Sequence, residues 1–169
     1  MIGRIERNFS YTIPDGEHKG RTLWSGRYCC VATVVFKKEG SDIFVLANQR
    51  GSGTPDFQGY WNCPCGFLEG NETGEQGAVR EVFEETGVQI HPSILVFHSV
   101  QTDPKVSNNG NVTLHYGAIV DHYSCIPPEG GEENEVADVR WINVEDIDKY
   151  KWAFNHDQLI KNVFYDLFV

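Results

Sequence analysis

The stretch that decides the fold is GFLEGNETGEQGAVREVFEETGV, residues 66–88. Thr73 and Gln76 have the spacing of a capping box, in which a threonine hydroxyl accepts from a backbone N–H three residues on and the glutamine reaches back. Gly87 supplies the left-handed residue that commonly follows the last turn of a helix. The stretch therefore predicts a helix from about Gly74 to Thr86.

Three glutamates of this helix crowd one side of it. At about 100° per residue, Glu81, Glu84 and Glu85 lie roughly opposite an apolar stripe. Each close pair repels by about 0.2 to 0.5 kcal/mol in an isolated helix, and the last turns of a helix prefer cations. A hard divalent cation such as Mg²⁺ or Mn²⁺ would relieve both problems, because its ligands are oxygen atoms. The alternative is a solvated acidic face, relieved by pairing of Arg80 with Glu84.

The flanking residues complete a known motif, G-x5-E-x7-R-E-U-x-E-E-x-G-U, where U is a bulky aliphatic residue. The residues that fit it are Gly66, Glu72, Arg80-Glu81-Val82, Glu84-Glu85 and Gly87-Val88. At every specified position the chain resembles the box of the Nudix hydrolase family. The resemblance implies an α/β protein with the Nudix fold, an α/β/α sandwich around a mixed β-sheet. It also implies an enzyme, a pyrophosphohydrolase that cleaves the diphosphate linkage of a nucleoside diphosphate joined to another group.

The resemblance further assigns roles to residues of the box. The implied ligands of one or more Mg²⁺ (or Mn²⁺) ions are Glu81, Glu84, Glu85 and the carbonyl of Gly66. The metal would bridge pyrophosphate oxygens and help to make a water nucleophilic. Arg80 is expected to orient the cluster, while Glu72 and Gly87 have structural roles in the box.

A general base is needed as well, because bound water is a weak nucleophile near neutral pH. Glu84 or Glu85 could serve. Many family members instead recruit an acidic residue from a later loop, and Glu135, six residues before Trp141, is the most similar position here. The other acidic residues of that loop are interpreted as solvated: Glu129, Glu132 and Glu133.

Residues outside the box bear on the substrate. Arg50 is a candidate phosphate contact with a solvent-exposed side chain as the alternative, and Trp61 could stack on a base or belong to the core. Pro104 lies sixteen residues after Val88, where the family's ADP-ribose hydrolases have a proline. An ADP-ribose-like substrate is therefore favoured. The alternatives are a non-catalytic, nucleotide-sensing Nudix domain and an enzyme acting on nucleoside triphosphates or nucleotide sugars.

The rest of the chain predicts one domain over residues 1–169. Strands are expected at 27–36 and 42–50, joined as a hairpin, and at 94–100, 112–123 and a stretch ending at 142, with a final helix capped by Asn155. This order of strands and helices predicts a mixed sheet that carries helices. Residues 1–25, broken by a turn at Pro14-Asp15-Gly16, are expected to form an arm packed on the domain edge.

The formal charge of −10 argues against a broad basic surface for duplex DNA or anionic lipid. A small nucleotide-derived substrate stays compatible, because a bound cation can reverse the local field. The five cysteines are an odd number and predict reduced thiols. The best apolar run, residues 29–36, is too short to span a membrane, so we expect a soluble, cytoplasmic protein. The family often forms dimers, and a homodimer stays open.

Overall fold

The computed structural model describes residues 10–12, 14–24, 27–103, 111–121 and 134–169, and its main body is built on one sheet. The seven strands of this sheet are β3 (Cys29–Glu39), β4 (Asp42–Arg50), β5 (Trp61–Asn62), β6 (Cys65–Phe67), β7 (Val96–Gln101), β8 (Val112–Val120) and β9 (Val136–Asn143). Their order is β5-β4-β3-β8-β7, with β6 paired to β3 and β9 to β4. Because β3 and β8 are parallel and the other pairs antiparallel, the sheet is mixed, as predicted.

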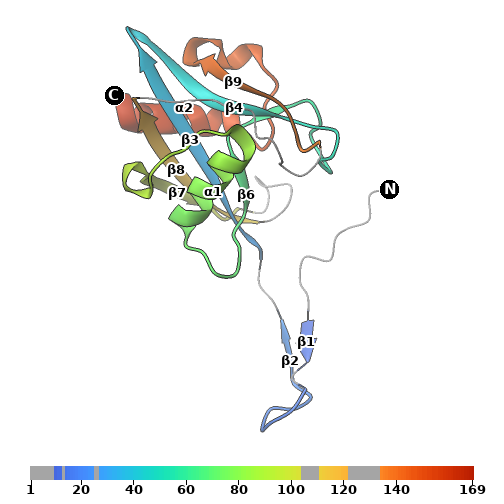
Figure 1. Ribbon diagram of the computed structural model, residues 1–169. Coiled ribbons are helices and arrows are strands. Elements are labelled where there is room, and N and C mark those ends of the chain that lie inside the picture. The colour runs from blue at the N-terminus through green and yellow to red at the C-terminus, as the bar shows by residue number, and fades with distance from the viewer. Residues whose placement is uncertain (1–9, 13, 25–26, 104–110, 122–133) are drawn as a thin grey trace.

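Two helices cover the two faces of the sheet. Figure 1 shows α1 (Gly74–Thr86) on the near face and α2 (His156–Phe168) behind it. Val35 and Leu46 pack with Val82 of α1, whereas residues of the opposite face pack with α2. The predicted α/β/α sandwich is therefore confirmed. Among the described residues, no helix is long and apolar enough to cross a membrane.

Strand β3 is the centre of the molecule. Residues 31–36 of this strand are all completely buried, since both of its faces lie under a helix. Such a strand is apolar without alternation, which matches the sequence CCVATVVF. The predicted hairpin is present, with Phe36 opposite Val45 and Glu39 opposite Asp42. Both strands of this hairpin bind a further short strand, since β3 pairs with β6 and β4 pairs with β5.

Helix α1 begins and ends as its sequence predicts. The Thr73 hydroxyl accepts from the Gln76 N–H at 3.3 Å, and the Gln76 side chain accepts from the Thr73 N–H at 2.8 Å. Gly87 has a φ of 70°, and its N–H donates to the Phe83 carbonyl at 2.8 Å. The capping box and the left-handed stop are both confirmed. They set the first and last residues of α1.

The predicted cap of α2 is wrong. Asn155 precedes the helix, but its backbone is left-handed (φ 59°, ψ 32°) and its side chain makes no capping hydrogen bond. Side-chain capping requires an extended backbone at this position, and Asn155 does not have one. Only its carbonyl serves the helix, accepting from the N–H groups of Gln158 at 3.1 Å and Leu159 at 3.2 Å.

Two short strands were not predicted. β3 and β4 pair with each other only over residues 36–39 and 42–45. Beyond that stretch, β5 pairs with β4 and β6 pairs with β3. Strands this short carry no periodic signal, so only their partners define them. Further along, the start expected at Ile94 belongs to a 3₁₀ turn, η1 (Pro92–Ile94). A second such turn, η2 (Val144–Lys149), leads from β9 toward α2.

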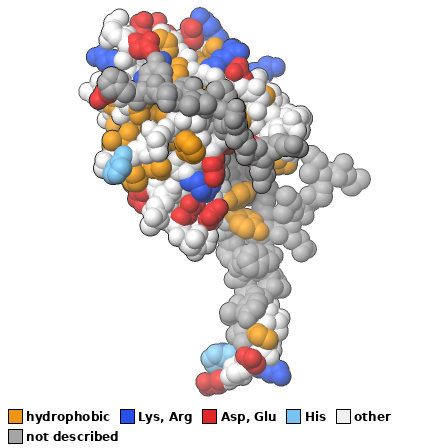
Figure 2. All heavy atoms as spheres, in the orientation of Figure 1, with side chains coloured by type: hydrophobic (Ala, Val, Ile, Leu, Met, Phe, Trp, Pro, Cys, Tyr) orange, Lys and Arg blue, Asp and Glu red, His pale blue; other side chains and the backbone are white. Residues whose placement is uncertain are grey.

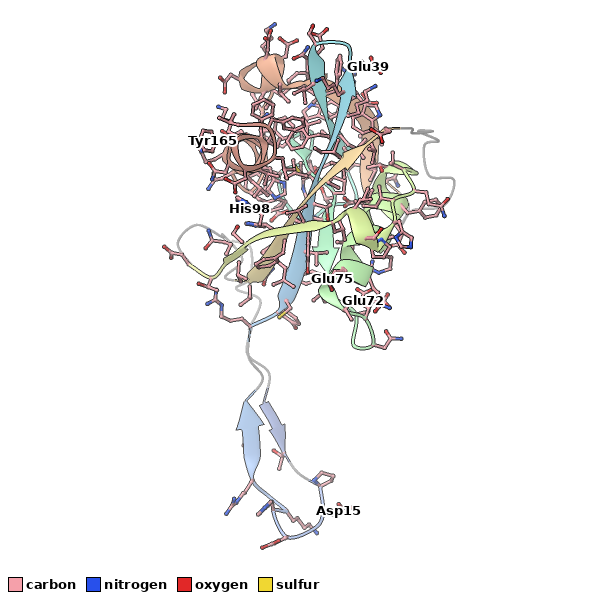
Figure 3. The ribbon with its side chains drawn as sticks, turned by 90° about the vertical axis from the view of Figure 1, so that its left-hand side faces the viewer. Asp15, Glu39, Glu72, Glu75, His98 and Tyr165 are labelled. Carbon is pink, nitrogen blue, oxygen red and sulfur yellow. The ribbon has the colours of Figure 1, made fainter. Side chains whose placement is uncertain are left out.

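The N-terminal arm forms its own hairpin. β1 (Ser10–Thr12) and β2 (Thr22–Trp24) pair antiparallel, with the predicted turn at Pro14-Asp15-Gly16 between them. Figures 1 and 3 both show this hairpin extending away from the main sheet. The described residues of the arm, 10–12 and 14–24, therefore do not pack on the domain edge as expected, and residues 1–9 lie outside the described part of the chain. Its exposed residues, 14–22, include no large apolar side chain and offer little apolar surface to bury against the body.

Candidate active site

Gly66 lets helix α1 approach the sheet closely. Gly66 lies in β6 opposite Val31 of β3, beneath the helix. A Cβ at this position would collide with the carboxylate of Glu81. Glu81 is 9% exposed, and its burial raises the pKa of its carboxyl. The glycine thus brings its backbone against the first of the three predicted metal-binding glutamates.

Arg80 holds the acidic residues of the box together. Its guanidinium donates to Glu72 at 2.7 and 3.0 Å, to Glu81 at 2.8 Å and to Glu84 at 2.8 Å. It also donates to the carbonyl of Phe67 at 2.9 Å. These bonds, the one to Glu72 foremost, raise the pKa of Arg80, and the same bond lowers the pKa of Glu72.

Figure 2 shows acidic and basic side chains gathered next to one another on this face, and Figure 3 shows Glu72 beside the start of α1. The alternative pairing of Arg80 with Glu84 is therefore present. Arg80 does more than neutralise an exposed face, however, because it also binds Glu81, which is buried, and the last residue of β6.

Glu85 faces the turn between β5 and β6. Its carboxylate accepts the backbone N–H of Cys65 at 2.9 Å. Burial raises the pKa of Glu85 well above its usual range, the charges of Glu81 and Glu135 raise it further, and Arg50 opposes them. Glu135, which immediately precedes β9, is thus one of the residues whose charge acts on Glu85, and its role as general base stays a prediction.

The donor chemistry suits a hard cation. Glu81, Glu84 and Glu85 offer only oxygen atoms, and Glu81 lies against the backbone of Gly66. Two of the carboxylates, those of Glu81 and Glu84, are engaged by Arg80. Within the described ranges no three acidic, histidine or cysteine side chains converge as a ready-made ion site. The residues fit Mg²⁺ or Mn²⁺ by donor type, and binding would require these carboxylates to turn partly away from Arg80.

The predicted substrate contacts are placed less favourably. Arg50 donates to the carboxylate of Asp56 at 2.7 Å and to its carbonyl at 3.0 Å, and its guanidinium lies 4.9 Å from the ring centre of Phe154. Trp61 is 6% exposed and packs in the core that α2 covers, so its ring does not face a surface where a base could stack. Pro104, like Glu129, Glu132 and Glu133, lies outside the described residues.

One contributor to the site was not predicted. The Asn62 side chain donates to the Cys63 carbonyl at 2.9 Å and to the Cys65 sulfur at 3.3 Å. These bonds brace the turn that presents the Cys65 N–H to Glu85. A single asparagine in a strand of only two residues has no pattern that would mark it. Its only sequence signal is its place just before the box.

Comparison with protein families finds one family model that covers most of the chain. Residues 28–163 match the model of the NUDIX domain. The chain is 29% identical to the ADP-ribose pyrophosphatase of Methanocaldococcus jannaschii over 109 residues, which are 63% of this chain and 58% of that protein. It spans only 40 to 64% of the length of the first three curated relatives that it matches.

Solved structures share the fold. The NUDIX domain of Shewanella oneidensis NrtR, in complex with ADP ribose, superposes with a TM-score of 0.70 at 26% identity, over 85% of this chain and 90% of that one. NrtR complexed with a 27mer DNA superposes with a TM-score of 0.66 at 27% identity, over 82% of this chain and 61% of that one.

Proposed function

This chain belongs to the NUDIX domain family, and from that premise we propose that it hydrolyses the diphosphate linkage of a nucleoside diphosphate derivative, with ADP-ribose as the favoured substrate. One observation carries the proposal. Arg80 gathers the box carboxylates on the side of α1 that meets Gly66, so oxygen ligands are concentrated beside a backbone that only glycine allows to come so close.

The glutamates of α1 and the Gly66 carbonyl would hold the cation. When bound, Mg²⁺ or Mn²⁺ supplies charge neutralisation for the diphosphate and lowers the pKa of water. The chain supplies orientation: Arg80 fixes Glu81 and Glu84, and the Cys65 N–H fixes Glu85. We propose that Glu135 is the general base that accepts a proton from the attacking water. Its side chain is exposed to solvent, and its charge raises the pKa of Glu85. Glu84 and Glu85 are the other candidates for this base.

ADP-ribose is favoured by two relatives. One is named an ADP-ribose pyrophosphatase, and the other, 26% identical, was solved with ADP ribose. Arg50 could contact a phosphate of this substrate only by exchanging its bonds to Asp56 for bonds to the ligand. The proline at position 104, the homodimer and the cytoplasmic location stay predictions.

A nucleotide-sensing domain is the second candidate, because NrtR was also solved with DNA. A sensor needs to bind its nucleotide but not to cleave it. The intact set of Glu81, Glu84 and Glu85 favours the enzyme, since three carboxylates on one helix face cost stability and serve chemistry.

The deciding experiment incubates the purified chain with Mg²⁺ and a substrate panel. The panel holds ADP-ribose, NADH, diadenosine polyphosphates, nucleotide sugars, coenzyme A and nucleoside triphosphates. We expect AMP from ADP-ribose, and a loss of turnover by about a hundredfold or more in Glu85→Gln with the melting temperature kept. Glu145→Gln, at an exposed site in η2, is the matched control and should act as wild type. Binding of ADP-ribose without cleavage would establish the sensor instead.

A further inference from the structure

Two aromatic rings lie exposed next to the acidic cluster. Tyr28 is 42% exposed and Phe67 is 57% exposed. Their ring centres are 5.5 Å apart and their planes meet at 66°, an edge-to-face pair. An exposed aromatic pair in mutual contact beside a polar site is a candidate surface for a ligand, unlike a single exposed apolar residue.

The fold holds both rings on a hydrogen-bonded frame. Phe67 ends β6 opposite Cys30 of β3, and the next residue, Leu68, donates its N–H to the Cys29 carbonyl at 3.0 Å. The carbonyl of Tyr28 accepts the N–H of Val112 at 2.9 Å. Both aromatic residues therefore project from backbone that the sheet fixes, and a ligand stacking on them would pay little to order them.

The pair is joined directly to the acidic cluster. Phe67 follows Gly66, and its carbonyl accepts from Arg80 at 2.9 Å, the same guanidinium that binds Glu81 and Glu84. Figure 2 shows hydrophobic side chains bordering the acidic ones on this face. A ligand with its charged part at the cluster would thus have its next group beside Tyr28 and Phe67.

We propose that Tyr28 and Phe67 form the surface on which the nucleobase of the substrate stacks. The inference rests on the proposed function only for the nature of the ligand. In a nucleoside diphosphate a single ribose separates the flat base from the charged diphosphate, which matches an aromatic surface adjoining a cation site. Trp61, which the sequence left open as a stacking ring or a core residue, is buried in the core, whereas Tyr28 and Phe67 are exposed.

The test compares binding of AMP with binding of ribose 5-phosphate by calorimetry in Mg²⁺, which needs no turnover. Wild type should bind AMP about tenfold or more tightly than ribose 5-phosphate, because the two ligands differ by the base. Phe67→Leu and Tyr28→Leu keep apolar bulk but remove the ring face. Each should weaken AMP severalfold and leave ribose 5-phosphate unchanged. Phe97→Leu, 54% exposed on the edge strand β7, is the matched control and should bind both as wild type.

Two results would overturn the inference. One is an equal affinity for AMP in wild type and in both ring variants. The other is an equal loss for AMP and ribose 5-phosphate, which would make the rings structural supports. Failure of the proposed function would give a different result. A domain that binds its nucleotide without cleaving it would still bind AMP more tightly than ribose 5-phosphate. In a cleaving enzyme, Phe67→Leu should raise KM for ADP-ribose severalfold with little change in kcat.

Discussion

Glu85 and Arg80 show how single residues in this site depend on their neighbours. Glu85 keeps a carboxyl whose pKa is raised by burial, and its fixed partner is the N–H of Cys65. Arg80 bonds to three carboxylates and one carbonyl at once. A guanidinium can do this because it offers five donors in a planar fork, which an ammonium does not. Arg80 is thus the residue whose loss should disturb the cluster most.

Arg80→Met tests that role. Removing the guanidinium leaves the buried Glu81 without its counter-ion, and we expect a loss of about 1 to 3 kcal/mol in unfolding free energy. Urea titration of both proteins measures it. Lys161→Met, which removes an exposed pair with Asp148, should unfold at nearly the same urea concentration as wild type. Equal effects of the two changes would show that Arg80 is no more than a surface cation.

At the scale of elements, α1 was predictable and the strands that complete the site were not. The start and end of α1 follow from local hydrogen bonds of Thr73, Gln76 and Gly87, so the sequence alone locates them. β5 and β6 exist only through pairing with β4 and β3, residues that lie 12 to 37 positions away. Local patterns cannot report such contacts, which is also why the sequence left two roles open for Trp61 and wrongly predicted a side-chain cap at Asn155.

Thr73→Ala tests the capping box. The alanine removes the acceptor of the Gln76 N–H, and we expect a loss of about 1 kcal/mol and a lower melting temperature. Thr73→Ser keeps a hydroxyl in the same place and should restore most of the loss. A melting temperature equal to wild type in Thr73→Ala would mean that tertiary packing alone holds this end of α1.

At the scale of the whole molecule, folding buries two histidine side chains, His115 of β8 and His156 of α2, as well as apolar groups. His156 is 5% exposed, accepts the N–H of Cys63 at 3.0 Å and has its pKa lowered to about 3 by burial. Burial also lowers the pKa of His115 to about 4. Both side chains are neutral in the folded state where the unfolded chain would bind protons, so the stability of the molecule depends on pH.

The sign of that dependence follows from proton binding. Below about pH 6.5 the unfolded state takes up more protons at these histidines, so stability present above pH 6.5 is lost as pH falls toward 4. Each group contributes up to about 1.4 kcal/mol per pH unit. Urea titrations from pH 7.5 to 4.5 should show a shallower loss in His115→Gln and His156→Gln. His18→Gln, at an exposed site in the arm, should follow wild type, and parallel slopes in all four proteins would contradict the assignment.

Divalent metal should stabilise the whole fold by mass action. At a hundred times its dissociation constant, a ligand that binds only the folded state adds about 2.7 kcal/mol. We expect Mg²⁺ to raise the melting temperature, and a chelator to reverse the rise. Glu85→Gln should shift less, and KCl at matched ionic strength should not reproduce the effect. An unchanged melting temperature at saturating Mg²⁺ would rule out tight binding by the free protein.

The family, the class of the fold, the central hairpin, the limits of α1 and the acidic residues of the box could all be predicted from the order of residues alone. These rest on local spacing and hydrogen bonds within a few residues, which the order of the chain already contains. That Arg80 binds Glu72 and Glu81 together, and that Tyr28 and Phe67 are exposed while Trp61 is buried, follows from the tertiary structure alone. The reason is physical: burial and charge pairing depend on residues brought together from distant parts of the chain, and no local pattern specifies which of them meet.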